Sequence, residues 1–235
     1  MSSANARETE NSRPAPALYV VTDRHATGGR PLVETVARVL DGAARAGVSP
    51  GTVAIQLREK DLEARALLHV ARSLRALTAR HGAALYVNDR ADVALAAGAD
   101  GVHLSGTSLS PSEIAVIAPT LSIAISAHSP GDVARAAAIA ARENAKIRFA
   151  VLGPIFDTPS KRGYGAPLGL AALAAVKALA LPVLAIGGVS LGNSRECLDA
   201  GAAGIACIRA LLAEENPEEI AFLVSRAILE SAPTH

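Results

Sequence analysis

The sequence ALYVNDRADVALAAGADGVHL, residues 84–104, has short apolar runs at its two ends and an Ala- and Leu-rich segment between them. The middle segment stops at Gly98, the residue type that commonly ends a helix before a strand begins. A strand, a helix and a second strand in this order predict a βαβ unit with parallel strands. The joint AGAD at 97–100 recurs as AGAA at 200–203, which favours a repeating array of such units.

Comparable apolar, β-rich runs recur along the whole chain. They lie at residues 18–22, 52–58, 84–88, 101–104, 121–126, 147–152, 182–186 and 204–208. Segments with helical spacing lie between most of them, and the following residues mark predicted helix ends or starts: Gly47, Gly82, Gly201, Pro111 and Pro217. Roughly 27 residues per strand–helix unit suit a compact (β/α)₈ barrel.

A doubly wound open sheet is the alternative fold, because a strand count does not show closure. No GxGxxG motif follows the first run, as a dinucleotide-binding sheet would need. We therefore predict an α/β protein with one domain, a TIM barrel over residues 17–231. The polar residues 1–16 are expected to form a disordered arm and to lack the apolar segment of a signal peptide.

Composition excludes several other classes of protein. The chain has 235 residues, 50% of them hydrophobic, with 23 basic and 22 acidic residues and only 3% aromatics. This composition is unlike that of a disordered chain or a nucleic-acid-binding protein. No uninterrupted apolar stretch is long enough to span a membrane, and the two cysteines suggest a reducing compartment. We expect a cytoplasmic protein, and a homo-oligomer stays open.

Polar residues gather where the predicted strands end, the side of a TIM barrel that carries the active site. Side chains alternate along a strand, so Gln56, Arg58 and Lys60 share one face. Two cations facing the barrel interior would need a polyanionic ligand, and the planar donors of Arg suit a phosphate. The alternative is a strand end that carries its charges into solvent.

Three further strand ends carry candidate residues. Asn88 and Asp89 suit Mg²⁺ beside a diphosphate, although the pair is also common in turns. Gly187 and Gly188 could let a phosphate approach the backbone closely, or could serve a tight turn. The loop 158–165 carries hydroxyls, cations and glycines that suit closure over phosphates, or is an ordinary surface loop. His128, at another strand end, is a candidate acid or base, or is simply hydrogen-bonded there. His103 lies inside the fourth predicted strand and is expected to be structural.

The motifs QLREK at 56–60, ND at 88–89 and GVHL at 101–104 are joined by four more: SAH at 126–128, GPIFDTPSK at 153–161, IGG at 186–188 and AGAAGIACI at 200–208. In this order they resemble the thiamine-phosphate synthase family over about residues 17–213. The resemblance implies a (β/α)₈ barrel and a transferase of thiamine biosynthesis. Such an enzyme joins hydroxymethylpyrimidine diphosphate to a (carboxy)thiazole phosphate with Mg²⁺, releasing pyrophosphate.

The resemblance also implies roles for individual residues. It assigns the pyrimidine diphosphate to Gln56, Arg58, Lys60, Asn88, Ser126 and Lys161, of which Arg58, Lys60, Ser126 and Lys161 would be catalytic. It assigns Mg²⁺ to Asp89, with Ser108 as a weak second ligand. It assigns the thiazole phosphate to Thr158, Ser160, Gly188 and the backbone around Ile208, and we add Arg209 as a candidate clamp.

The chain departs from the family pattern at two of these positions. Ser108 stands where the family usually has a second aspartate, and Arg209 stands where it usually has a serine. The turn SGTSLSP at 105–111 also resembles that of the related thiazole tautomerases, which isomerise the thiazole phosphate without metal. Asp89 and the set of Gln56, Arg58 and Lys60 favour the synthase. A non-catalytic barrel that binds thiazole phosphate and regulates partners is a third possibility.

Overall fold

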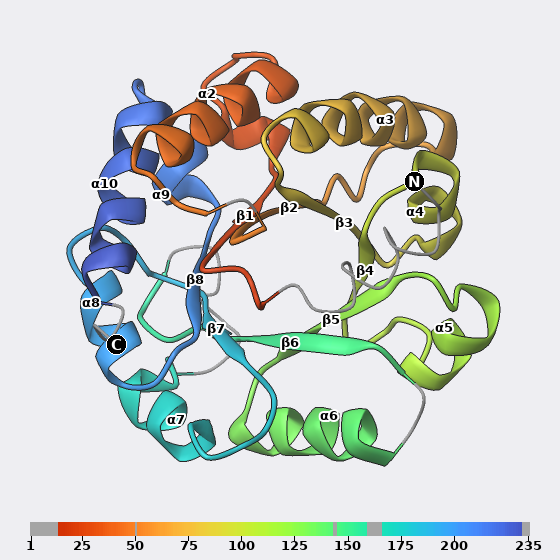
Figure 1. Ribbon diagram of the computed structural model, residues 1–235, viewed down its shortest axis with the longest axis vertical. Coiled ribbons are helices and arrows are strands. Elements are labelled where there is room, and N and C mark those ends of the chain that lie inside the picture. Colours follow the sequence, from red (N-terminus) through yellow and green to blue (C-terminus); the bar gives the residue numbers. More distant parts are fainter. Residues whose placement is uncertain (1–13, 50, 143–144, 159–165, 232–235) are drawn as a thin grey trace.

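The computed structural model describes residues 14–49, 51–142, 145–158 and 166–231 of the protein. Eight parallel strands follow one another around a closed barrel, because β1 pairs with both β2 and β8 (Figure 1). The strands are β1 (Leu18–Val21), β2 (Val53–Leu57), β3 (Ala84–Asn88), β4 (Gly101–Leu104), β5 (Ser122–Ala127), β6 (Ile147–Leu152), β7 (Val183–Ala185) and β8 (Gly204–Cys207). The predicted TIM barrel is confirmed, and closure excludes the open sheet.

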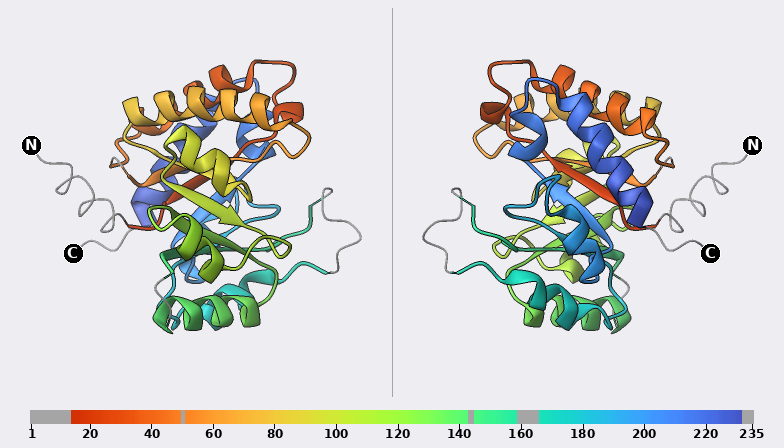
Figure 2. Two further views of the ribbon diagram at one scale, coloured as in Figure 1. Left: turned by 90° about the vertical axis from the view of Figure 1, so that its right-hand side faces the viewer. Right: turned by 90° about the vertical axis from the view of Figure 1, so that its left-hand side faces the viewer.

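Helices cover the outside of the barrel, with α2 and α3 along one edge and α6 and α7 along the opposite edge (Figure 2). The helices are η1 (Arg24–Ala26), α2 (Leu32–Arg45), α3 (Ala64–Arg80), α4 (Ala91–Ala97), α5 (Pro111–Ile117), α6 (Pro130–Arg142), α7 (Gly169–Val176), α8 (Ser194–Asp199), α9 (Arg209–Leu212) and α10 (Pro217–Ser231). Within the described ranges, no helix combines the length and hydrophobicity needed to cross a lipid bilayer.

The predicted helix boundaries are confirmed by the backbone. Four glycines adopt positive φ where a helix gives way to the next strand: Gly47, Gly82, Gly98 and Gly201. Glycine adopts this conformation without the steric cost that a Cβ would add. Pro111 and Pro217 are the first residues of α5 and α10, where the missing N–H of proline costs nothing.

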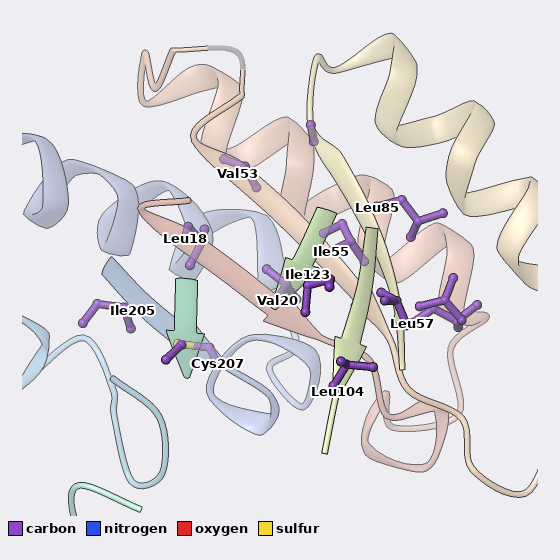
Figure 3. Close-up of a cluster of buried hydrophobic side chains, with 14 of the residues drawn as sticks. Leu18, Val20, Val53, Ile55, Leu57, Leu85, Leu104, Ile123, Ile205 and Cys207 are labelled. Carbon is purple, nitrogen blue, oxygen red and sulfur yellow. The ribbon is translucent and has the colours of Figure 1, made fainter. Parts of the chain in front are cut away.

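Alternation along the strands sorts the side chains into two apolar layers. One layer lies between the strands and the helices and includes Leu18, Ile55 and Leu57 (Figure 3). The other fills the barrel and includes Tyr19, Tyr86 and Phe149, whose rings meet edge to face at centroid distances of 5.2 to 5.9 Å. This aromatic cluster makes the barrel interior a packed floor beneath the strand ends.

The first described residues close the other end of the barrel. Ala15 packs against the inner layer, and Pro16 is buried. A Cβ on Gly204 would lie 2.4 Å from the carbonyl oxygen of Pro16, so the chain passes directly over β8 here. Residues 1–13 of the predicted arm lie outside the described residues.

Candidate functional site

Polar side chains replace the apolar ones where the inner faces of β2 and β3 reach the end of the barrel. Gln56 follows Ala54 on the inner face, is only 3% exposed, and donates from Nε2 to Oδ1 of Asn88 over 2.9 Å. Asn88 donates from Nδ2 to Oδ2 of Asp89 over 2.7 Å. The structure therefore joins three of the predicted site residues into one hydrogen-bonded row.

Asp89 stands at the turn after β3 in a left-handed conformation with φ of 59°, which aspartate and asparagine adopt more readily than most other residues. Its Oδ1 accepts hydrogen bonds from the Ser105 amide over 3.1 Å and from the Ser108 hydroxyl. The Ser105 amide also lies 2.6 Å from Oγ of Ser108. Ser108 therefore lies against the carboxylate, beside the position where the resemblance puts metal.

The charge of Asp89 is held by its surroundings. Partial burial acts to raise its pKa, but the hydrogen bonds from Ser108 and Ser105 outweigh burial, with help from the positive charge of Lys60. The pKa of Asp89 is lowered as a result, and the carboxylate stays ionised near neutral pH.

A second row of hydrogen bonds crosses the barrel from β1 to β5. The Tyr19 hydroxyl lies 3.0 Å from Nδ1 of His103, and Nε2 of His103 lies 2.9 Å from Oγ of Ser126. Burial, together with the nearby charge of Arg58, lowers the pKa of His103 to about 3, against a smaller opposing effect of Asp89. The predicted residue Ser126 thus has a neutral histidine beneath it.

Charged side chains at the end of β2 alternate in direction, with Arg58 and Lys60 on one side and Glu59 on the other. Arg58 is half-buried and Lys60 is exposed, and their charges act on His103 and Asp89 respectively. In the described part of the chain, the Arg58 guanidinium has no hydrogen-bond or ion-pair partner, whereas its backbone N–H donates to Thr22 Oγ1 over 2.9 Å. Arg58 therefore has a free guanidinium for a ligand.

Glu59 points the other way and anchors the loop after β1, a role that the sequence analysis missed. Glu59 is 5% exposed. Both of its carboxylate oxygens accept a hydrogen bond from the Arg24 backbone N–H over 3.2 Å. The Arg24 guanidinium contacts Glu59 at 3.2 Å and forks onto Asp61 at 2.5 Å to each oxygen. These contacts tie the β1 and β2 loops together beside Arg58.

The opposite side of the rim holds the residues predicted for the thiazole phosphate. Gly188 adopts φ of 65°, and a Cβ there would lie 2.6 Å from the carbonyl oxygen of Asp157, so the turn itself requires glycine. Thr158 is half-buried at the end of the described part of this loop, while Ser160 and Lys161 lie outside the described residues. Whether Gly188 and Thr158 bind phosphate stays a prediction.

Arg209 is the first residue of α9 and is exposed, with Ile208 directly before the helix. Over the ranges that the structure covers, Arg209 forms no ion pair, so the alternative of a surface pair with Glu214 or Glu215 is not found. The carbonyl oxygen of Glu214 instead accepts from Arg30 over 2.6 Å. Arg209 is therefore free at the rim.

His128 follows β5 and is exposed. Its Nδ1 lies 3.1 Å from the carbonyl oxygen of Gly153, and its backbone N–H donates to Asp132 over 2.9 Å. The Nδ1 atom must carry a proton for that bond, because a carbonyl oxygen only accepts. These two contacts hold His128 at the rim. Its second ring nitrogen, Nε2, takes part in neither of them.

The donor set around Asp89 suits a hard cation that keeps most of its ligands from substrate and water. One carboxylate is flanked by the hydroxyls of Ser105 and Ser108, all of them oxygen donors. Among the described residues, no group of three or more His, Cys, Asp or Glu side chains forms a protein-only metal cage. Mg²⁺ fits such a site, because it binds through one or two carboxylates plus phosphate oxygens.

Comparison with known proteins places the whole barrel in one family. The family model described as thiamine monophosphate synthase matches residues 18–211. A chain from Geobacter sulfurreducens is 45% identical over 219 residues, which cover 92% of this chain and 94% of that one. The thiamine-phosphate synthase of Albidiferax ferrireducens is 40% identical over 202 residues, which cover 85% and 86% of the two chains.

A solved structure agrees with these sequence matches. The thiamine phosphate pyrophosphorylase from Pyrococcus furiosus superposes with a TM-score of 0.78 at 32% identity, covering 96% of this chain and 100% of that one. The residues that the family model matches include both hydrogen-bonded rows and all eight strands. The chain therefore belongs to the thiamine monophosphate synthase family.

Proposed function

We propose that the protein is a thiamine-phosphate synthase, which joins 4-amino-2-methyl-5-hydroxymethylpyrimidine diphosphate to a (carboxy)thiazole phosphate and releases pyrophosphate. The observation that carries the proposal is the row from Gln56 through Asn88 to Asp89, beside the free guanidinium of Arg58. A carboxylate and cationic side chains at one rim suit a diphosphate with its counter-ion. A thiazole tautomerase would have no diphosphate to hold there.

The reaction breaks the C–O bond between the pyrimidine methylene carbon and the diphosphate, and the electron pair leaves with the diphosphate oxygen. The thiazole nitrogen then supplies the pair for the new C–N bond. Arg58, Lys60 and Lys161 would neutralise the departing charge, which is where electrostatic stabilisation is most effective. When bound, Mg²⁺ would add positive charge at the same oxygens, held by Asp89 with Ser108 beside it.

Positioning accounts for the remaining residues. Gln56, Asn88 and Ser126 would orient the pyrimidine diphosphate above the aromatic floor. Thr158, Ser160, Gly188 and the backbone at Ile208 would hold the thiazole phosphate, so that its nitrogen faces the methylene carbon. Holding both reactants in line removes much of the entropic cost of their encounter. A cytoplasmic location is part of the same proposal.

The deciding experiment incubates the protein with both substrates, with and without Mg²⁺, and measures thiamine phosphate by chromatography. Product that forms only with Mg²⁺ supports the synthase. Isomerisation of the thiazole phosphate without metal would instead identify a tautomerase, which the Ser105–Ser108 turn would suit. Binding of thiazole phosphate with neither reaction would indicate the non-catalytic regulator.

Ser108→Asp is expected to lower the Mg²⁺ concentration needed for half-maximal activity. The new carboxylate would stand next to Asp89, which Ser108 now contacts, and carboxylates are stronger Mg²⁺ ligands than hydroxyls. The measurement is a Mg²⁺ titration of the synthase rate. Thr107→Asp, on the same turn, controls for added charge alone. An unchanged Mg²⁺ requirement in Ser108→Asp would place the metal elsewhere or remove it from the reaction.

Arg209→Ser is expected to raise the KM for thiazole phosphate about 10- to 100-fold and to leave the KM for the pyrimidine diphosphate nearly unchanged. The estimate follows from losing a charge-assisted hydrogen bond of about 1.5–3 kcal/mol. Steady-state kinetics with each substrate varied in turn measure both constants. Arg226→Ser removes an exposed arginine on α10 that pairs with Glu230, and it should change neither constant. Equal values in Arg209→Ser and wild type would exclude the clamp.

A further inference from the structure

The row from Tyr19 through His103 to Ser126 links the buried floor of the barrel to the rim. Tyr19 is 0% exposed and His103 is 2% exposed. Ser126 is half-buried at the end of β5. The Tyr19 and His103 rings also stack, with centroids 5.8 Å apart and an interplanar angle of 21°. Packing and hydrogen bonds therefore fix the imidazole at both of its nitrogens.

The direction of these hydrogen bonds can be worked out from the phenol. Among the described residues, the Tyr19 hydroxyl has one hydrogen-bond partner, Nδ1 of His103. A buried hydroxyl proton without an acceptor costs about 1–3 kcal/mol. If Nδ1 carried a proton, in a neutral or a charged ring, the Tyr19 proton would have no acceptor. Tyr19 must therefore donate to Nδ1, and the ring proton lies on Nε2.

The same reasoning fixes the hydroxyl at the rim. A protonated Nε2 can only donate, so Oγ of Ser126 accepts the hydrogen bond from His103 across 2.9 Å. The Ser126 hydroxyl forms no other hydrogen bond within the described chain. Its own proton is left to point away from His103, toward the space above the barrel floor.

We propose that Tyr19 and His103 are positioning residues that turn the Ser126 hydroxyl into a hydrogen-bond donor for the pyrimidine diphosphate. The proposal rests on the proposed function and adds the polarity of the contact: the substrate atom above Ser126 is an acceptor, such as a ring nitrogen or a phosphoryl oxygen. The opposite tautomer would present lone pairs to that atom and would repel it. Tyr19 thus favours a substrate with an acceptor atom at this position, although it does not contact the substrate itself.

A direct test is nitrogen NMR of the histidine rings in the substrate-free protein, because the ¹⁵N shifts distinguish the two neutral tautomers. The His103 ring is assigned by its loss in His103→Gln, or by its through-space contact with the Tyr19 ring protons if that variant does not fold. The expected result is a proton on Nε2 in wild type and a mixture of tautomers in Tyr19→Phe. A proton on Nδ1 in wild type would overturn the proposal.

A kinetic test asks whether Tyr19 acts through Ser126. Tyr19→Phe should lower kcat/KM about 3- to 10-fold, the size expected for one neutral hydrogen bond. In a Ser126→Ala background the same change should have no further effect, since the hydroxyl that it orients is gone. Tyr86→Phe removes a phenol from the same aromatic cluster and should leave kcat/KM unchanged.

Two kinetic results would count against an effect of Tyr19 that passes through His103 to Ser126. Equal losses in Tyr19→Phe and Tyr86→Phe would assign the effect to packing, and losses that add in the double variant with Ser126→Ala would show a route that bypasses Ser126. The NMR measurement needs no substrate. If wild type makes no thiamine phosphate, the proposed function fails, but the NMR result still shows whether Tyr19 sets the tautomer of His103.

Discussion

Arg58→Ala is expected to lower kcat/KM for thiamine phosphate formation by about 10- to 100-fold, and to leave the melting temperature unchanged or higher. A charge-assisted hydrogen bond to the diphosphate contributes about 1.5–3 kcal/mol, which gives this range of rates. The free protein loses little, because Arg58 is half-buried without an ion-pair partner in the described chain. Steady-state kinetics and thermal unfolding measure the two effects.

Two matched variants sharpen this prediction. Arg58→Lys keeps the charge but not the planar pair of donors, so it should recover only part of the activity. Arg65→Ala removes an exposed arginine from α3 and should behave as wild type. Wild-type kinetics in a normally folded Arg58→Ala protein would show that the diphosphate binds elsewhere.

Asp89→Asn is expected to reduce the synthase rate at least about 100-fold and to leave a residual rate that needs far more Mg²⁺. The variant removes one negative charge from the proposed metal site, where several kcal/mol of charge stabilisation are at stake. Asparagine also tolerates the left-handed backbone at φ of 59°, so the turn should persist. A Mg²⁺ titration of the rate, with circular dichroism as the check on folding, makes the measurement.

Asp92→Asn provides the control for Asp89→Asn. Asp92 lies on α4 and forms an exposed pair with Arg90 at 2.6 Å, so the change removes a carboxylate of the same chain segment that already has its own partner. It should alter neither the rate nor the Mg²⁺ requirement. If Asp89→Asn kept the wild-type rate and the wild-type Mg²⁺ dependence, Asp89 would have no part in metal binding.

The strands could be predicted closely because two local signals agree. β3, β4 and β6 have the residue bounds that their apolar runs predicted, and the remaining strands differ from their runs by one residue at one or both ends. Glycines with positive φ, such as Gly98, separate four of the runs from the helix before them. Closure depends on pairing between β1 and β8, which are far apart in the sequence, so no local pattern could show it.

The site was predictable where alternation or a motif selected the residue. Gln56 follows from alternation along its strand, and Asn88 follows from its place at the end of a strand. The contact between Ser108 and Asp89 was expected only through the family resemblance. Arg24 could not be found, because its pairing with Glu59 and Asp61 depends on two loops that meet only in the closed barrel.

Tyr19 gave no signal either, since a tyrosine in an apolar strand resembles any other core residue. Tyr19 packs in an aromatic cluster for which Gly101, on the inner face of β4, leaves room. A Cβ on Gly101 would lie 2.4 Å from the ring of Tyr86. The dependence of one side chain on the missing side chain of another is not visible in a single sequence.

The Arg58 guanidinium, which has no partner among the described residues, also has a consequence for the amount of the protein in the cell. Any anion that binds the folded chain and not the unfolded one shifts the folding equilibrium by mass action. Cellular proteases remove unfolded chains continuously, so a small shift in that equilibrium changes abundance. The amount of this protein should therefore follow the supply of its diphosphate substrate, which would make the enzyme pool self-adjusting without any change in gene expression.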